Sequence, residues 1–371
     1  MKIFHCDHCG ALVFFENVQC VSCGHTLAFL QDRRIVSSLE PTESGLWRSP
    51  LQPDVEYRLC ANYTEHNVCN WALPADSEET LCASCRLTSV IPDISDLAQK
   101  TNWYKLETAK RRLIHTLTAL SLPIFSKSDD AEQGLTFEFK TPGKGPDAEP
   151  VLTGHANGVI TINADEADDA ERERRRLQLH EPYRTVLGHL RHEIGHYYWD
   201  RLIAQSDRLQ GFRELFGDEQ QDYSEALKRH YDDGPPADWM ERFVSAYSSS
   251  HPWEDWAETW AHYLHMIDTL DTAAACGLML KPRREDEPSI QSRAKAGGDF
   301  DRMIKDWFAL TYVLNSLNRG MGLADAYPFV LSTPAIEKLR FVHETIQAQP
   351  TTQADRSIEV RKSQALQAAS G

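Results

Sequence analysis

The first 86 residues hold eight of the nine cysteines of this 371-residue chain, and six of those eight form close C-x-x-C pairs. In the first cluster, Cys6 and Cys9 are followed after ten residues by Cys20 and Cys23, and each pair precedes a glycine. Two such pairs form tight turns that direct four thiolates at one ion, the tetrahedral arrangement of structural zinc. This spacing therefore predicts a fold organised by metal, with only a small hydrophobic core.

The second cluster is less regular. Cys82 and Cys85 form another pair, whereas Cys60 and Cys69 are separated by eight residues. The four thiolates predict a second structural zinc site, in which His66 could replace one cysteine. The alternative is that Cys60 and Cys69 are thiols of an ordinary core.

The composition changes near residue 95 and predicts three parts. Residues 1–95 are rich in cysteine, residues 96–345 have helical periodicity, and the polar residues 346–371 are expected to be a disordered tail. Alternating apolar residues predict strands at 134–140 and 158–163. We expect an α+β fold, a zinc-ribbon-type region followed by a mainly helical domain with a small β-sheet. Helices are predicted over residues 97–122, 183–205, 218–242, 253–271 and 300–318.

The overall charge argues against nucleic acid as a partner. The formal net charge is −16, from 39 Lys and Arg against 55 Asp and Glu, and such a field repels phosphate backbones. No apolar run is long enough to cross a membrane, and the N-terminus does not resemble a secretory signal. Clustered cysteines without such a signal indicate metal ligation in a reducing, cytoplasmic compartment, and Cys276 is expected to be a buried apolar residue.

Residues 183–203 (YRTVLGHLRHEIGHYYWDRLI) have a helical apolar pattern and place His192 and His196 four positions apart. Side chains at i and i+4 share one helix face, so both imidazoles can reach one ion. Glu193 lies about 100° further round the helix, where it can take a proton from a zinc-activated water. This is the H-E-x-x-H pattern. Alone, it is also compatible with histidines that are merely hydrogen-bonded.

A catalytic zinc needs a third protein ligand, and residues 251–265 (HPWEDWAETWAHYLH) offer one. Glu254 and Glu258 would share a helix face opposite three tryptophans, and carboxylates on the inner side of such a helix need a buried partner. The alternative is a surface helix with ordinary acidic residues. Asp200, one turn beyond His196, is interpreted as a supporting carboxylate, because the helix carries it away from a shared ion.

Together the two segments resemble the gluzincin branch of the zincin metallopeptidases. The resemblance implies that Glu254 is the third zinc ligand and that Glu258 supports His192 or His196. The EDWAE segment is similar to the ligand helix of the anthrax lethal factor type, which has a tyrosine seven residues before the ligand glutamate. That position is Tyr247 here, and the resemblance implies that it stabilises the oxyanion. The alternatives for this role are Tyr263 and His262.

Over residues 1–320, the Cys-rich ribbon followed by these two segments resembles a bacterial family of zinc-binding metallopeptidases with an N-terminal zinc-ribbon domain. The resemblance implies peptide-bond hydrolysis with one catalytic and one or two structural zinc ions. It also implies a peptide or protein substrate and a ribbon that can bind a protein partner. Zincins carry an edge strand that pairs with extended substrate, and GVITIN at 158–163 is its expected equivalent.

Two other functions are compatible with the same residues. One is a non-catalytic protein in which the ribbon binds partners and the zincin core is a scaffold. The other is a zinc hydrolase of a non-peptide substrate. Metal content separates the first from an enzyme, because a catalytic ion with an open coordination position is more readily chelated than a Cys₄ ion.

Overall fold

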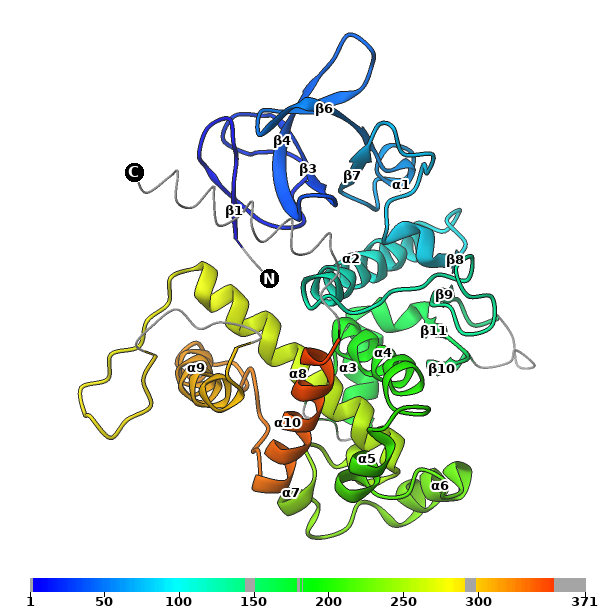
Figure 1. Cartoon of the computed structure of the whole chain (residues 1–371), viewed down its shortest axis with the longest axis vertical. Helices are drawn as coiled ribbons and strands as arrows, with labels where there is room; N and C mark the ends of the chain where they lie inside the picture. Colours follow the sequence, from blue (N-terminus) through cyan, green and yellow to red (C-terminus); the bar gives the residue numbers. More distant parts are fainter. Residues whose placement is uncertain (1–2, 144–150, 179–180, 182, 291–297, 350–371) are drawn as a thin grey trace. The chain divides into compact units, whose positions relative to one another are not determined.

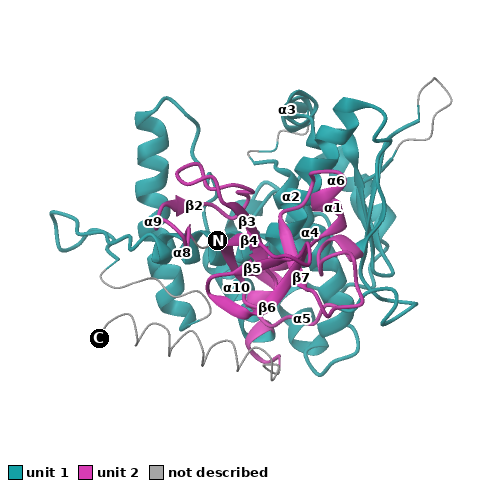
Figure 2. Cartoon of the chain, turned by 90° about the horizontal axis from the view of Figure 1, so that it is seen from above, with its two compact units in different colours: residues 1–2, 87–113, 125–345 teal, residues 3–86, 114–124, 346–371 magenta. Residues whose placement is uncertain are grey.

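The computed structural model describes residues 3–143, 151–178, 181, 183–290 and 298–349. It divides into two compact units, coloured separately in Figure 2. The first unit contains Leu87–Leu113 and Phe125–Thr345, and the second contains Ile3–Arg86 and Ile114–Ile124. Helices and strands both contribute, which confirms the α+β class. The division at 95 and 345 stays a prediction, and residues 350–371 of the expected disordered tail lie outside the described residues.

The second unit is built from short strands (Figure 1). β1 and β2 pair as a hairpin, and β3 to β7 close a five-stranded barrel. Leu30, Leu39 and Tyr57 are buried within the barrel core. The barrel was not predicted, because β3 and β4 are buried on both faces and so lack apolar alternation. The elements are β1 (Phe4–His5), β2 (Leu12–Val13), β3 (Thr26–Leu30), β4 (Ile35–Pro41), β5 (Trp47–Ser49), β6 (Gln52–Leu59), α1 (Ala61–Thr64) and β7 (Trp71–Pro74).

The first unit contains a four-stranded sheet in the order β10-β11-β9-β8. The two predicted strands are present as β9 (Thr136–Lys140) and β11 (Val159–Asn163), whereas β8 (Thr88–Val90) and β10 (Gly154–Ala156) are too short to be recognised from their pattern. β11 pairs on both sides, in parallel with β9 and antiparallel with β10. The expectation that residues 158–163 form the edge strand is therefore wrong; β10 is the edge.

Helices make up most of this unit, and the five predicted helical segments are present. The segment 218–242 contains two helices separated by a turn at Gly234, and three further helices, α3, α5 and α10, lie outside the five segments. None of the described helices is long and apolar enough to span a membrane. The helices are α2 (Leu97–Ala119), α3 (Asp169–Gln178), α4 (Val186–Leu202), α5 (Leu209–Phe216), α6 (Tyr223–Asp233), α7 (Trp239–Arg242), α8 (Pro252–Ala275), α9 (Phe300–Gly320) and α10 (Thr333–Gln347).

The alternative of a surface helix with ordinary acidic residues does not apply to α8. Trp256 and Trp260 are fully buried, and so is Asp255, so α8 is a core helix. The expectation that Cys276 is buried is wrong: it is exposed, because α8 ends at Ala275 and the next residue lies beyond the packed part of the helix.

The close packing of α4 against α8 positions the residues described next. A Cβ atom at Gly195 would lie 3.0 Å from the Cα of Ala257 and 3.2 Å from the Cβ of Trp260, so only glycine fits this crossing without displacement. The carbonyl of Gly195 also accepts a hydrogen bond of 2.8 Å from the indole N–H of Trp256. The glycine within the H-E-x-x-H segment therefore lets the two helices approach closely.

Candidate metal centre

Three side chains from the two helices converge at this crossing. His192 and His196 lie on α4, and Glu254 lies in the first turn of α8. The Nε2 atoms of the two histidines are 3.2 Å apart, and the Glu254 carboxylate oxygens lie 2.9 Å from His192 and 3.6 Å from His196. In a tetrahedral zinc site with N and O ligands, neighbouring ligand atoms are about 3.3 Å apart. The three side chains thus have the spacing of a shared ion.

The electrostatics of the cluster also favour a cation. Burial acts to lower the pKa of His192, but Glu254 and Glu258 raise it well above its usual value, so the surroundings stabilise positive charge. Oε2 of Glu254 is buried and makes no hydrogen bond within the described residues, although Nε2 of His192 lies 2.9 Å away. A buried carboxylate oxygen of this kind needs a positive partner, which a metal ion would provide.

Glu258 holds the His192 ring from the other side. Its Oε1 atom is 2.8 Å from Nδ1 of His192, and its Oε2 atom accepts a hydrogen bond of 2.6 Å from Ser245. Burial acts to raise the pKa of Glu258, but the bond with His192 contributes most to lowering it to about 2. A carboxylate at Nδ1 places the ring proton there and leaves the Nε2 lone pair free for a metal.

Both cysteine clusters are assembled in the second unit, and all nine cysteines are free thiols. Sγ atoms lie 3.7 Å apart in the Cys6–Cys23 pair, 3.6 Å in Cys9–Cys20 and 3.8 Å in Cys69–Cys82. Thiolates around one zinc ion are about 3.8 Å apart, so both clusters have zinc-site dimensions. Cys60 and Cys85 complete the second group, which is buried throughout and does not include His66.

Residues 99–345 match a family described as "putative zinc-binding metallo-peptidase", and residues 3–96 match a zinc-ribbon domain. The chain belongs to this metallopeptidase family. Uncharacterized proteins of Mycobacterium bovis and Mycobacterium tuberculosis are 45% identical to it over 347 residues, which cover 93% of this chain and 95% of each relative. No solved structure matches the chain. The family expected from the sequence is confirmed, and the family descriptions and the cysteine clusters support zinc binding.

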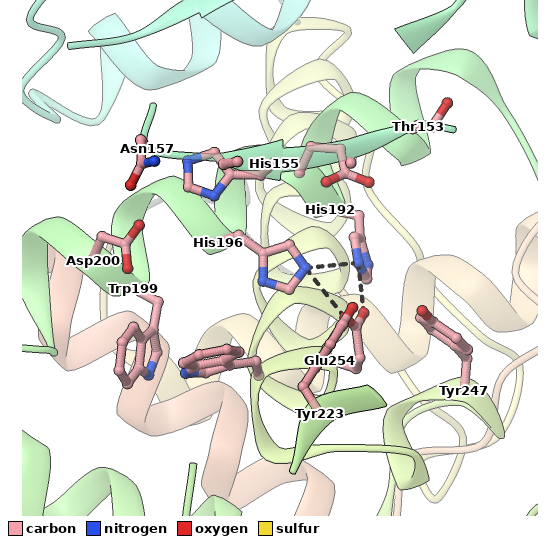
Figure 3. Close-up of a pocket in the computed structure, with 14 residues that line it drawn as sticks. Thr153, His155, Asn157, His192, His196, Trp199, Asp200, Tyr223, Tyr247 and Glu254 are labelled. Carbon is pink, nitrogen blue, oxygen red and sulfur yellow. Dashed lines mark hydrogen bonds and ion pairs between the residues drawn. The ribbon is translucent and has the colours of Figure 1, made fainter. Parts of the chain in front are cut away.

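In this family member, the three candidate ligands open into a cavity of about 310 Å³, drawn in Figure 3. Glu193 also lines the cavity, and burial raises the pKa of its carboxyl group. A carboxylate with a raised pKa is a stronger base, which favours its accepting a proton. Figure 3 shows His192, His196 and Glu254 facing one another, joined by dashed lines.

Two tyrosines line the cavity, of which only Tyr247 was predicted. Its ring lies 6.0 Å from that of His192, and burial raises the pKa of its phenol well above the usual value, so it remains a hydrogen-bond donor. Tyr223 donates a hydrogen bond of 2.6 Å to Oε1 of Glu254. The alternatives Tyr263 and His262 do not line the cavity; they bond to His343 and Tyr327, respectively.

The edge strand β10 supplies the opposite wall of the cavity. Its start is tied to α4 through buried Glu166, which accepts a hydrogen bond of 2.8 Å from Thr153 and lies 2.5 Å from Nδ1 of His189. On β10, Nε2 of His155 accepts a hydrogen bond from the Gly158 N–H, and burial lowers the pKa of His155 to about 3. Its ring is therefore neutral and carries its proton on Nδ1.

Asp200 lines the same cavity but does not support a ligand histidine through a hydrogen bond. Its side chain is exposed, and the carboxylate that contacts Nδ1 of the candidate ligand His192 is Glu258. Three residues of the site, Tyr223, Ser245 and His155, were not predicted. None of them lies in a recognisable motif, and they reach the site only through the packing of α4, α8 and β10.

Proposed function

We propose that this protein is a zinc-dependent peptidase whose catalytic ion is held by His192, His196 and Glu254. The observation that carries the proposal is the convergence of these ligand atoms on one side of an open cavity, with Glu193 in its wall. A set of two imidazoles and one carboxylate is a ligand set of catalytic zinc, because it leaves a fourth position for water or substrate. Membership of the metallopeptidase family supports the same function.

A zinc ion in this position supplies a Lewis acid that lowers the pKa of water and polarises a carbonyl group. Glu193 accepts a proton from the attacking water and passes it to the amine of the leaving product. The burial of Glu193 favours this transfer, because it raises the pKa of the carboxyl group and so makes the carboxylate a stronger base toward the attacking water. Tyr247 donates a hydrogen bond to the oxygen on which negative charge develops.

Peptides are the proposed substrates because the cavity is bounded by a sheet edge. β10 pairs with β11, and within the described residues its other edge is not paired with another strand. An extended peptide can add to such an edge through backbone hydrogen bonds, whatever its side chains. This would hold a scissile bond beside the three zinc ligands.

The cysteine clusters are proposed to hold two further zinc ions that have structural roles only. A site closed by four thiolates has no open position for water or substrate. Eight thiolates available for metal also favour a reducing compartment, so we place the protein in the cytoplasm. The ribbon is then free to bind a protein partner.

A comparison of cleavage products tests this function. Cell extracts are treated with the zinc-loaded full-length chain or with Glu193→Gln, and new peptide N-termini are quantified by mass spectrometry. We expect wild-type protein to generate new termini that the variant does not, while both bind the same amount of zinc. Equal products from both proteins would refute Glu193 as the base. No products from either would favour the scaffold or the non-peptide hydrolase.

A further inference from the structure

One end of the cavity is lined by polar and aromatic side chains that the proposed chemistry does not use. Asp200 lies one helical turn after His196 on α4, so both side chains face the same side of the helix. Figure 3 shows Asp200, Asn157 and Trp199 together at this end. The ring of Trp253, which also lines the cavity, lies 5.4 Å from that of Trp199.

Asp200 supplies a negative charge at this end of the cavity. Three of the residues that line the cavity are carboxylates, and none is lysine or arginine. Under the proposed function, Glu254 binds zinc and Glu193 moves the proton, which leaves Asp200 without a chemical role. Its side chain is exposed and forms no hydrogen bond or ion pair with any other residue that the structure describes.

The neighbouring lysine and arginine side chains have partners other than Asp200. Arg201 follows Asp200 in sequence, but its guanidinium forms an ion pair of 2.6 Å with Asp130. Lys127 does not line the cavity, and its ammonium donates hydrogen bonds of 2.8 Å each to the carbonyls of Glu132 and Asn157. Within the described residues, Asp200 therefore forms no ion pair with a lysine or arginine, and it can accept a cation from a bound molecule.

The surrounding groups suit a positively charged nitrogen on an apolar stem. A carboxylate accepts strong, charge-assisted hydrogen bonds from ammonium or guanidinium groups. The side-chain oxygen of Asn157 offers a further acceptor. Trp199 and Trp253 also line the cavity, and indole rings can cover methylene groups and attract a cation. An acidic side chain would meet repulsion from Asp200 instead.

We propose that this end of the cavity binds a cationic nitrogen of the substrate, either a lysine or arginine side chain or a free N-terminal ammonium. The inference rests on the proposed peptidase function, to which it adds the substrate class. It gives Asp200 a role in substrate selection, which differs from the ligand support expected from the sequence.

Peptide binding tests this proposal without requiring hydrolysis. The first set of probes consists of N-acetylated hexapeptide mixtures in which one position at a time is lysine, norleucine or glutamate. The second set consists of the norleucine mixtures with a free N-terminus in place of the acetyl group. Binding is measured with the zinc-loaded Glu193→Gln full-length chain and with the same protein carrying Asp200→Asn. We expect lysine at one position, or the free N-terminus, to bind about tenfold more tightly than acetylated norleucine peptides, and Asp200→Asn to abolish this preference.

Asp207→Asn, which removes the same charge from an exposed position outside the cavity, is the matched control and should keep the preference. A preference confined to acetylated lysine peptides identifies the side chain as the ligand, and one confined to free N-termini identifies the terminal ammonium. Two results overturn the proposal: no preference for a cation in either set, or a preference that survives Asp200→Asn. Loss of zinc from Asp200→Asn would also overturn it, and would indicate instead that Asp200 supports a zinc ligand. The preference for a cation is measured by binding alone, so it can hold even if wild type and Glu193→Gln give the same cleavage products. Failure of the proposed peptidase function and failure of the proposed cation site are therefore distinguishable.

Discussion

Oε1 of Glu258 lies 2.8 Å from Nδ1 of His192, on the opposite side of the imidazole from Glu254. The ring is thus held between two carboxylates of α8 that are one helical turn apart. The outer one, Glu258, is itself fixed by Ser245. This relationship orients the Nε2 lone pair of His192 toward the proposed ion before any metal binds.

Glu258→Gln should weaken zinc binding at this centre by about 10-fold to 100-fold, because a neutral amide no longer fixes the ring tautomer or raises the basicity of the histidine. Competition with a fluorescent zinc chelator measures the affinity. The control is Glu241→Gln at an exposed position of α7, which should bind zinc like the wild type. Unchanged affinity in Glu258→Gln would contradict the supporting role.

The two tyrosines of the cavity should differ when each is replaced by phenylalanine. Tyr247→Phe removes a donor to the developing oxyanion, so kcat should fall by about 100-fold with zinc affinity retained. Tyr223→Phe removes the bond to Glu254, so zinc affinity should fall by about tenfold. Steady-state kinetics on a cleaved peptide and chelator competition separate the effects. The assigned roles are wrong if Tyr247→Phe loses zinc or if Tyr223→Phe retains it fully.

The candidate ligands could be predicted from sequence because they lie at helical spacing. His192 and His196 are four residues apart, and Glu254 followed from its tryptophan-rich helix and from the family resemblance. The groups around them were not accessible in this way. Tyr223 begins a different helix and reaches Glu254 only in the folded chain. β10 has three residues, too few for alternation to be recognised.

The fold shows the same limit. The long helices were predicted because apolar residues recur at helical spacing over several turns. The barrel was missed because β3 and β4 are buried on both faces and β5 and β7 have only 3 and 4 residues. Gly195 illustrates the difference: in sequence it is one of two unspecified motif positions, but in the structure it sets how closely α4 approaches α8. Close packing between distant segments leaves no periodic pattern in the sequence.

Acid should destabilise the first unit through His265 on α8. Its ring lies 5.8 Å from Trp307 and 5.6 Å from Tyr327, and burial lowers its pKa to about 3. The unfolded chain then binds more protons between about pH 6.5 and 3, so stability is lost as the pH falls through this range. From pH 7 to 5 the free energy of unfolding should decrease by about 2 kcal/mol because of this histidine.

Denaturant titrations at pH 7 and 5 of wild type and His265→Phe check this contribution. The variant keeps an aromatic ring at the site but cannot be protonated, so it should lose about 2 kcal/mol less than the wild type over the same interval. Other titrating groups affect both proteins equally and cancel in the comparison. An identical pH dependence in the two proteins would show that His265 does not contribute.

Loss of a buried thiol should unfold the second unit. Cys82→Ser breaks the second cluster, whose zinc would stabilise the fold around it, so the variant should lose one zinc ion and become protease-sensitive within residues 3–86. Cys276→Ser changes an exposed cysteine outside the clusters and should alter stability by less than about 0.5 kcal/mol. Limited proteolysis with mass spectrometry compares the two. Equal resistance would mean that the second cluster does not require metal.

The zinc content of the full-length chain and of His196→Ala, measured by elemental mass spectrometry, tests the central claim most directly. If His192, His196 and Glu254 hold an ion apart from the cysteine clusters, the wild type should contain about three zinc ions per chain and His196→Ala about two. The same zinc content in both proteins would contradict a metal centre between α4 and α8.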